Sequence, residues 1–205
     1  MVAIKIKKKK PMPIGQKIFY ILSAIFLLGA FIYLGTKDFQ APNRRKTDNL
    51  AFSEEYGITE DNLFKYKTTK ETLEIMQNGS GIIFFGFPEN EWSKEYALMM
   101  NETAKKLNIK ELYYYNFKAA RSSSNHSYSQ MVEKLKDFLP TLDNGVQNIY
   151  APSMAIIKNG FVVFYDAETS ITPGTIKPSE YWSSESIVQK EEMMQTMFQT
   201  YINMN

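Results

Sequence analysis

Residues 81–96 read GIIFFGFPENEWSKEY, and this stretch contains a strand, a turn and the start of a helix. The run from Gly81 to Phe87 is almost entirely apolar, as expected for a strand that is covered on both faces. Beyond the turn at Pro88, apolar residues recur at helical spacing from Trp92 onwards. The stretch therefore predicts an α/β domain in which a helix starts directly after a buried strand, a place where reactive side chains often lie.

The rest of the chain continues this alternation of strands and helices. Thr68 and Glu71 form a capping box that starts a helix, and an Asn-Gly turn at residues 159–160 lies between two apolar runs that indicate a hairpin. The polar residues 121–129 are predicted to form a loop. In chain order, we predict a strand at 64–67, a helix at 68–78, a strand at 81–87, a helix at 92–107, a strand at 111–116, a helix at 131–139, strands at 154–157 and 161–165, and a helix at 184–202.

The N-terminal part of the sequence predicts a membrane anchor. Residues 18–34, IFYILSAIFLLGAFIYL, are uncharged and mostly apolar, and residues 14–17 extend the run because a lysine side chain can reach the membrane surface. We therefore predict a transmembrane helix at residues 14–35. A cleaved signal peptide is the alternative, but the run is long and no small-residue cleavage site follows it closely. Six lysines precede the apolar run at residues 18–34, five of them in residues 1–13, so the basic tail of residues 1–13 is expected in the cytoplasm and the rest of the chain outside it.

A stalk and one globular domain are predicted to follow this single-pass span of the cell membrane. Residues 36–62 are polar, include Pro42 and charges of both signs, and show no sustained periodicity, so we predict a stalk there. The domain is predicted to occupy residues 63–205. A chain of 205 residues with 44% hydrophobic residues suffices for one domain of ordinary size with a buried core.

The composition argues against several classes of function. The net charge is +2, from 24 basic and 22 acidic residues, and the excess lies in the N-terminal tail, which argues against nucleic acid as a partner. The chain contains no cysteine, which excludes disulfides, thiolate nucleophiles and thiolate metal sites. His126 is the only histidine, so few side chains are suited to a metal ion. We expect neither a metal nor a cofactor.

The element order and two motifs resemble the thioredoxin-like superfamily over about residues 63 to 203. The turn FPENEWS is similar to the Phe-Pro-Glu-Cys-Pro-Trp-Cys turn of thioredoxin-like proteins from low-GC Gram-positive bacteria. Asn90 and Ser93 stand where that family has its two redox cysteines, Glu91 replaces the intervening proline, and Trp92 keeps the family's residue. The resemblance implies a thioredoxin-like fold, with a central mixed sheet flanked by helices, whose Cys-x-x-Cys positions have been replaced.

A second motif, NIYAPSMAIIKNG at residues 148–160, extends the resemblance. Its Ala151-Pro152 pair matches the cis-proline position of the family, so the resemblance implies a cis bond there. In that fold the loop before this proline exposes backbone groups beside the start of the helix, and an extended peptide can pair with them as an added strand. The resemblance therefore implies a peptide-binding edge formed by Trp92, Ala151 and Pro152.

Side-chain chemistry at the turn limits what this site can do. Thiol–disulfide exchange needs an attacking thiolate and a leaving sulfur, and neither an amide nor a hydroxyl replaces them, so oxidoreductase activity is excluded. A hydrolytic pair of Ser93 and His126 is disfavoured, because nothing in the sequence ties them together. We favour Asn90 as a helix cap over direct ligand contact. Trp92 is read equally as an edge of the core or as a binding anchor.

We therefore predict a non-enzymatic, redox-inactive, membrane-anchored module that holds an extended segment of a secreted or membrane protein. The alternative is a structural subunit of a membrane complex in which the domain acts as a rigid spacer. The resemblance also permits an accessory role in peptide or bacteriocin export. The sequence does not name the partner protein.

Overall fold

The computed structural model describes residues 47–141, 144–168, 176–182 and 184–204. The predicted basic tail at residues 1–13 and the predicted span at residues 14–35 lie outside the described residues. Within the ranges that are described, no helix is long and apolar enough to cross a membrane.

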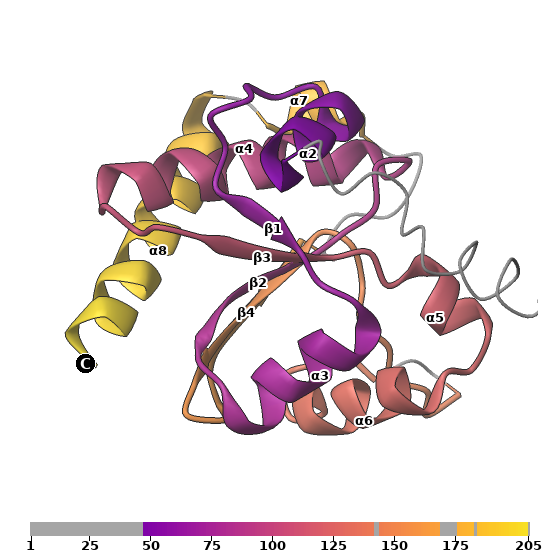
Figure 1. The fold of residues 1–205 in the computed structure, drawn as a ribbon. Coiled ribbons are helices and arrows are strands. Elements are labelled where there is room, and N and C mark those ends of the chain that lie inside the picture. Colours follow the sequence, from indigo (N-terminus) through magenta and orange to yellow (C-terminus); the bar gives the residue numbers. More distant parts are fainter. Residues whose placement is uncertain (1–46, 142–143, 169–175, 183, 205) are drawn as a thin grey trace, which may run out of the picture. The chain divides into compact units, whose positions relative to one another are not determined.

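A five-stranded mixed sheet forms the centre of the fold (Figure 1). Its order is β1-β3-β2-β4-β5, with β1, β3 and β2 parallel and β4 and β5 antiparallel to their neighbours. All five residues of β2 are buried, as its unbroken apolar sequence predicts. The strands are β1 (Phe64–Tyr66), β2 (Gly81–Phe85), β3 (Leu112–Tyr115), β4 (Ser153–Lys158) and β5 (Phe161–Ala167).

Helices cover both faces of this sheet. The longer helices α4 and α8 pack together with α2 on one face, while α3 and α6 pack together on the other (Figure 1). The helices are α2 (Asp48–Tyr56), α3 (Thr69–Asn78), α4 (Glu91–Lys106), α5 (Lys118–Ser122), α6 (His126–Leu135), α7 (Pro178–Tyr181) and α8 (Ser184–Asn203). The predicted mixed α/β class with a central sheet and flanking helices is confirmed for the described residues.

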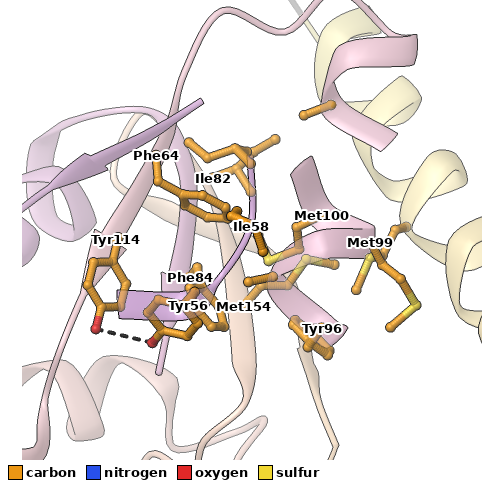
Figure 2. Packing of buried hydrophobic residues seen from close by; sticks show 14 of the residues in the cluster. Tyr56, Ile58, Phe64, Ile82, Phe84, Tyr96, Met99, Met100, Tyr114 and Met154 are labelled. Carbon is orange, nitrogen blue, oxygen red and sulfur yellow. Dashed lines mark hydrogen bonds between the residues drawn. The ribbon is translucent and has the colours of Figure 1, made fainter. Parts of the chain in front are cut away.

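Alternation along the central strands divides the interior into two cores. Ile82 and Phe84 of β2 pack beneath α4, whereas Ile83 and Phe85 pack beneath α3 and α6. Successive side chains of a strand point to opposite faces, so a buried strand must supply apolar residues to both. Figure 2 shows the first core, where Phe84 lies among Phe64, Tyr114 and Met154.

The predicted stalk is wrong for residues 48–56, which form α2. Phe52 of this helix is fully buried and stacks on Phe64, with 4.0 Å between the ring centroids. The Tyr56 hydroxyl lies 3.1 Å from the Tyr114 hydroxyl, within hydrogen-bond distance, as Figure 2 shows. The domain therefore begins near Thr47 and not at residue 63. Two aromatic residues one helical turn apart, in an otherwise polar segment, bury this helix.

Local signals account for the remaining differences from the prediction. Residues 121–129 are not one loop, because α5 continues to Ser122 and α6 begins at His126. The Asn125 side chain accepts a hydrogen bond from the Tyr128 amide and caps α6. Asparagine is favoured both in loops and at helix caps, so the polar sequence around it fitted a loop equally well. Helix α6 ends at Leu135, before the predicted residue 139, and the short helix α7 was not predicted. The capping box of α3 and the hairpin between β4 and β5 are confirmed.

The burial of α2 gives a direct test of the domain boundary. Phe52→Ala should lower the free energy of unfolding by about 3–5 kcal/mol, because it leaves a cavity against Phe64 and Tyr114. Urea denaturation of the full-length chain measures this change. Phe161→Ala is the matched control, since that ring is 75% exposed on β5 and its loss should cost under about 0.5 kcal/mol. Equal effects of the two substitutions would contradict the placement of α2 in the core.

Candidate functional site

Asn90 organises the start of α4. Its side-chain oxygen accepts hydrogen bonds from the Trp92 amide at 3.1 Å and from the Ser93 hydroxyl at 3.0 Å. The predicted role of Asn90 as the helix cap is therefore confirmed, and Glu91 lies in the first turn, where the helix dipole favours a negative charge. Ser93 is fully buried, so its hydrogen bond to Asn90 satisfies a polar group that has no access to water.

The same asparagine joins the start of α4 to the segment before β4. Its side-chain nitrogen donates to the Ala151 carbonyl oxygen at 3.3 Å. This contact follows from the sheet, because β2 and β4 are antiparallel neighbours with Phe85 opposite Ser153. The turn that follows β2 and the residues that precede β4 must then lie at the same edge. The structure thus brings together the two sequence motifs predicted to form one site.

The backbone of Ala151 is available to a partner on one side only. The Ala151-Pro152 peptide bond is cis, as the sequence resemblance implied. The Ala151 carbonyl accepts from Asn90, whereas the Ala151 amide makes no hydrogen bond within the described part of the chain. Ala151 is half-buried, and Pro152 next to it is buried. An extended peptide placed here would find a free backbone donor and an acceptor already shared with Asn90.

Trp92 lies at the border between the core and the surface. Its ring is half-buried and packs edge-on against Tyr181 and Trp182, with centroid distances of 5.3 and 6.3 Å. Both sequence readings of Trp92 thus have a structural basis, since one part of the ring packs inward and another part remains accessible. The covering residues belong to α7 and its C-terminal end; Pro178 in the first turn of α7 is a helix-start signal, although no helix was predicted there.

A buried charged cluster adjoins this site and was not found by sequence reasoning. Lys190 of α8 lies 3.1 Å from Asp166 and 2.9 Å from Glu168, measured from its ammonium nitrogen to the carboxylate oxygens. The Tyr96 hydroxyl donates to Asp166 and the Tyr181 hydroxyl donates to Glu168, each at 2.5 Å. Burial, together with the charge of Asp166, raises the pKa of Tyr96 well above its ordinary value, so its hydroxyl stays protonated as a donor.

This cluster fixes the parts that surround the site. The Glu168 amide donates to the Pro152 carbonyl at 3.1 Å, so the charged groups follow directly from the end of the β4–β5 pair. Glu168 accepts a hydrogen bond from Tyr181 and so holds α7 against Trp92. Glu168 also pairs with Lys190 and so holds α8 near the end of β5. In the sequence these residues are isolated charges on separate elements, and only the packing of α4, α7 and α8 around β5 brings them together.

Catalytic chemistry between Ser93 and His126 has no geometric basis. Ser93 lies in α4, on one face of the sheet, while His126 is the exposed first residue of α6, which packs on the other face. The Ser93 hydroxyl donates to Asn90, an amide that does not act as a general base. Among the described residues, no group of three or more His, Asp or Glu side chains is arranged to hold a metal ion.

Comparison with known proteins adds no further assignment. No family model, curated protein or solved structure matches the chain. The function is therefore argued from the sequence and the geometry of this site.

The two roles of Asn90 predict a larger cost for its loss than for an ordinary helix cap. Asn90→Ala removes the cap of α4 and leaves the buried Ser93 hydroxyl without its acceptor, so unfolding should become easier by about 2–3 kcal/mol. Asn125→Ala, which removes only the cap of α6, is the matched control and should cost about 1 kcal/mol. Urea denaturation of both variants decides the point. A cost for Asn90→Ala no greater than that of the control would show that Ser93 does not depend on Asn90.

The buried cluster gives a second stability prediction. Lys190→Met removes the ammonium group that lies within 3.1 Å of Asp166 and of Glu168, two largely buried carboxylates, and should lower the free energy of unfolding by about 3–5 kcal/mol. Lys106→Met is the control, because Lys106 forms an exposed ion pair with Glu191 that is worth at most about 1 kcal/mol. Glu168→Gln removes one of the two negative charges that Lys190 balances, so adding it to Lys190→Met should restore part of the lost stability. If the two lysine variants unfold at the same urea concentration, the cluster does not hold α8 in place.

Proposed function

We propose that this chain is a redox-inactive, thioredoxin-like binding module. In this proposal it holds an extended segment of a partner protein at the edge formed by Trp92, Ala151 and Pro152. The observation that carries the proposal is the unpaired Ala151 amide, held beside the start of α4 by the hydrogen bond between Asn90 and the Ala151 carbonyl. A backbone donor at an accessible edge is the group that an added strand needs.

The topology supports the thioredoxin-like assignment. Three parallel strands in the order β1-β3-β2 are followed by the antiparallel pair β4 and β5, and helices cover both faces. The start of α4 and the Ala151-Pro152 bond lie together, as the resemblance in the two motifs requires. The proposed family therefore agrees with the strand order, the helix positions and the two motifs at once.

The residues of the site favour binding over catalysis. Asn90 and Ser93 stand at the two positions where the resembling family has cysteines, and here they hydrogen-bond to each other at 3.0 Å. This bond closes the turn in a way that needs no sulfur and offers no redox couple. The proposal therefore assigns the turn a structural role and assigns recognition to the neighbouring backbone and to Trp92.

We further propose that the module is anchored to the cell membrane through residues 14–35, with the domain on the extracytoplasmic side. The support is the apolar run at residues 18–34 and the six lysines that precede that run. An anchored module of this kind meets secreted or membrane proteins as they emerge, which suits a holding or accessory role.

A rigid spacer is the second candidate, and two contacts favour it. Asn90 shares the Ala151 carbonyl, and Tyr181 packs against part of Trp92. Both contacts fill space that a bound peptide would otherwise use. In this alternative the domain would take part in a membrane complex through its predicted span and not through the edge at Trp92.

Altering either the binding edge or the predicted span separates the binding module from the rigid spacer. Trp92→Ala should reduce co-purification of bound protein from native membranes roughly thirtyfold, equivalent to the ~2 kcal/mol of an interface hot spot. Replacing residues 18–34 with an unrelated apolar span should leave co-purification unchanged. Thermal unfolding of both variants, followed by circular dichroism, checks that the fold is retained.

The opposite pattern supports the spacer. If Trp92→Ala retains its bound proteins while the exchange of residues 18–34 loses them, the binding-edge proposal is wrong. Lys70→Ala, at an exposed position of α3, serves as a control that should change neither result.

A further inference from the structure

A basic side chain borders the segment that leads to Ala151. Arg121 of α5 is exposed, and its guanidinium donates to the Ile149 carbonyl at 3.4 Å. Ile149 precedes Ala151 by two residues, and both belong to the same stretch before β4. Two residues of chain span at most about 7 Å, so the guanidinium lies within side-chain reach of a strand paired with Ala151.

Aromatic packing holds this arginine in place. The guanidinium carbon lies 5.4 Å from the centre of the Phe117 ring, a distance typical of a cation–π contact. Phe117 is fully buried, stacks on Tyr128 at 6.2 Å and packs edge-on against Phe87 at 5.6 Å. Because Phe87 leads into the turn before Asn90, the same aromatic group supports both the arginine and the turn.

Arg121 forms no ion pair with any carboxylate among the described residues. Lys118, one turn earlier on α5, is paired with Glu89 at 2.8 Å. Across the described ranges of the chain, no carboxylate lies within ion-pair distance of Arg121. Lys118 already balances Glu89, so among the described residues Arg121 remains a positive charge without a paired carboxylate.

We propose that the extended segment bound at Ala151 carries an aspartate or glutamate side chain, and that Arg121 binds its carboxylate. This inference rests on the proposed binding edge and specifies the chemistry of its partner. A strand that pairs with the amide of Ala151 runs past Ile149, and every second side chain points to the same side. One such side chain would then meet the guanidinium, whose planar donors match a carboxylate.

The surroundings favour a carboxylate over a phosphorylated residue. A phosphate carries close to two negative charges and is usually bound by a cluster of arginines. Here a single guanidinium lacks a paired carboxylate among the described residues, and Glu89, in the turn before Asn90, is paired with Lys118. One negative charge completes this arrangement, whereas a second would remain unbalanced.

Selection from a library of short random peptides tests the inference. The full-length chain, in mild detergent, is immobilised and used to enrich peptides in parallel with Arg121→Glu, Lys70→Glu and Trp92→Ala. Peptides enriched by the unaltered chain should carry Asp or Glu at one fixed position. Arg121→Glu should abolish that preference or turn it to Lys and Arg, and should bind the selected acidic peptides at least about fivefold more weakly. Lys70→Glu makes the same change in net charge on exposed α3 and should keep the preference.

The remaining outcomes overturn one proposal or both. Enrichment that depends on Trp92 but shows no acidic preference overturns the role of Arg121 and leaves the binding edge intact. A preference that Lys70→Glu loses equally would reflect net charge alone and would also overturn it. An absence of any enrichment that depends on Trp92 overturns the binding edge, and the inference with it. Thermal unfolding of each variant verifies that the fold is retained.

Discussion

The position of β2 is the constraint on which the other features depend. It is buried on both faces, pairs in parallel with β3 and pairs antiparallel with β4. Because its neighbours run in opposite directions, the turn that leaves β2 and the segment that enters β4 meet at one edge. Asn90 then contacts Ala151, although 61 residues separate them in the chain. A polar residue within β2 would disturb the core on the face to which its side chain points, and with it the strand that sets this meeting point.

Polar side chains at the start of α4 fix the geometry of the turn by hydrogen bonding, a role that a covalent link could also fill. Asn90 accepts from a backbone amide and from the buried Ser93 hydroxyl while it donates to Ala151. These three bonds satisfy buried polar groups and fix the geometry of the edge, so the turn can be rigid without chemical reactivity. The proposed peptide edge and the proposed arginine contact both depend on that rigidity.

The charged cluster of Lys190, Asp166 and Glu168 fixes α7 and α8 beside Trp92. Lys190 balances Asp166, in the last part of β5, and Glu168, just after β5, and Tyr181 extends the cluster to Trp92. Breaking such a buried network by removing one partner is costly, because the groups that remain stay charged and dehydrated. The packing of α7 against Trp92 is thus tied to the same interactions that hold α8 on the sheet.

The sequence alone determined the buried strand at residues 81–85, the capping box of α3, the Asn90 cap and the β4–β5 hairpin, because each depends on neighbouring residues. It also pointed to Ala151 and Trp92 through a resemblance in two motifs. Only the tertiary structure decided that Phe52 and Tyr56 make α2 part of the core, since their burial depends on a cavity formed by distant strands. The partners of Lys190 and the place of Arg121 beside Ile149 were likewise set by packing between elements, which no local pattern encodes.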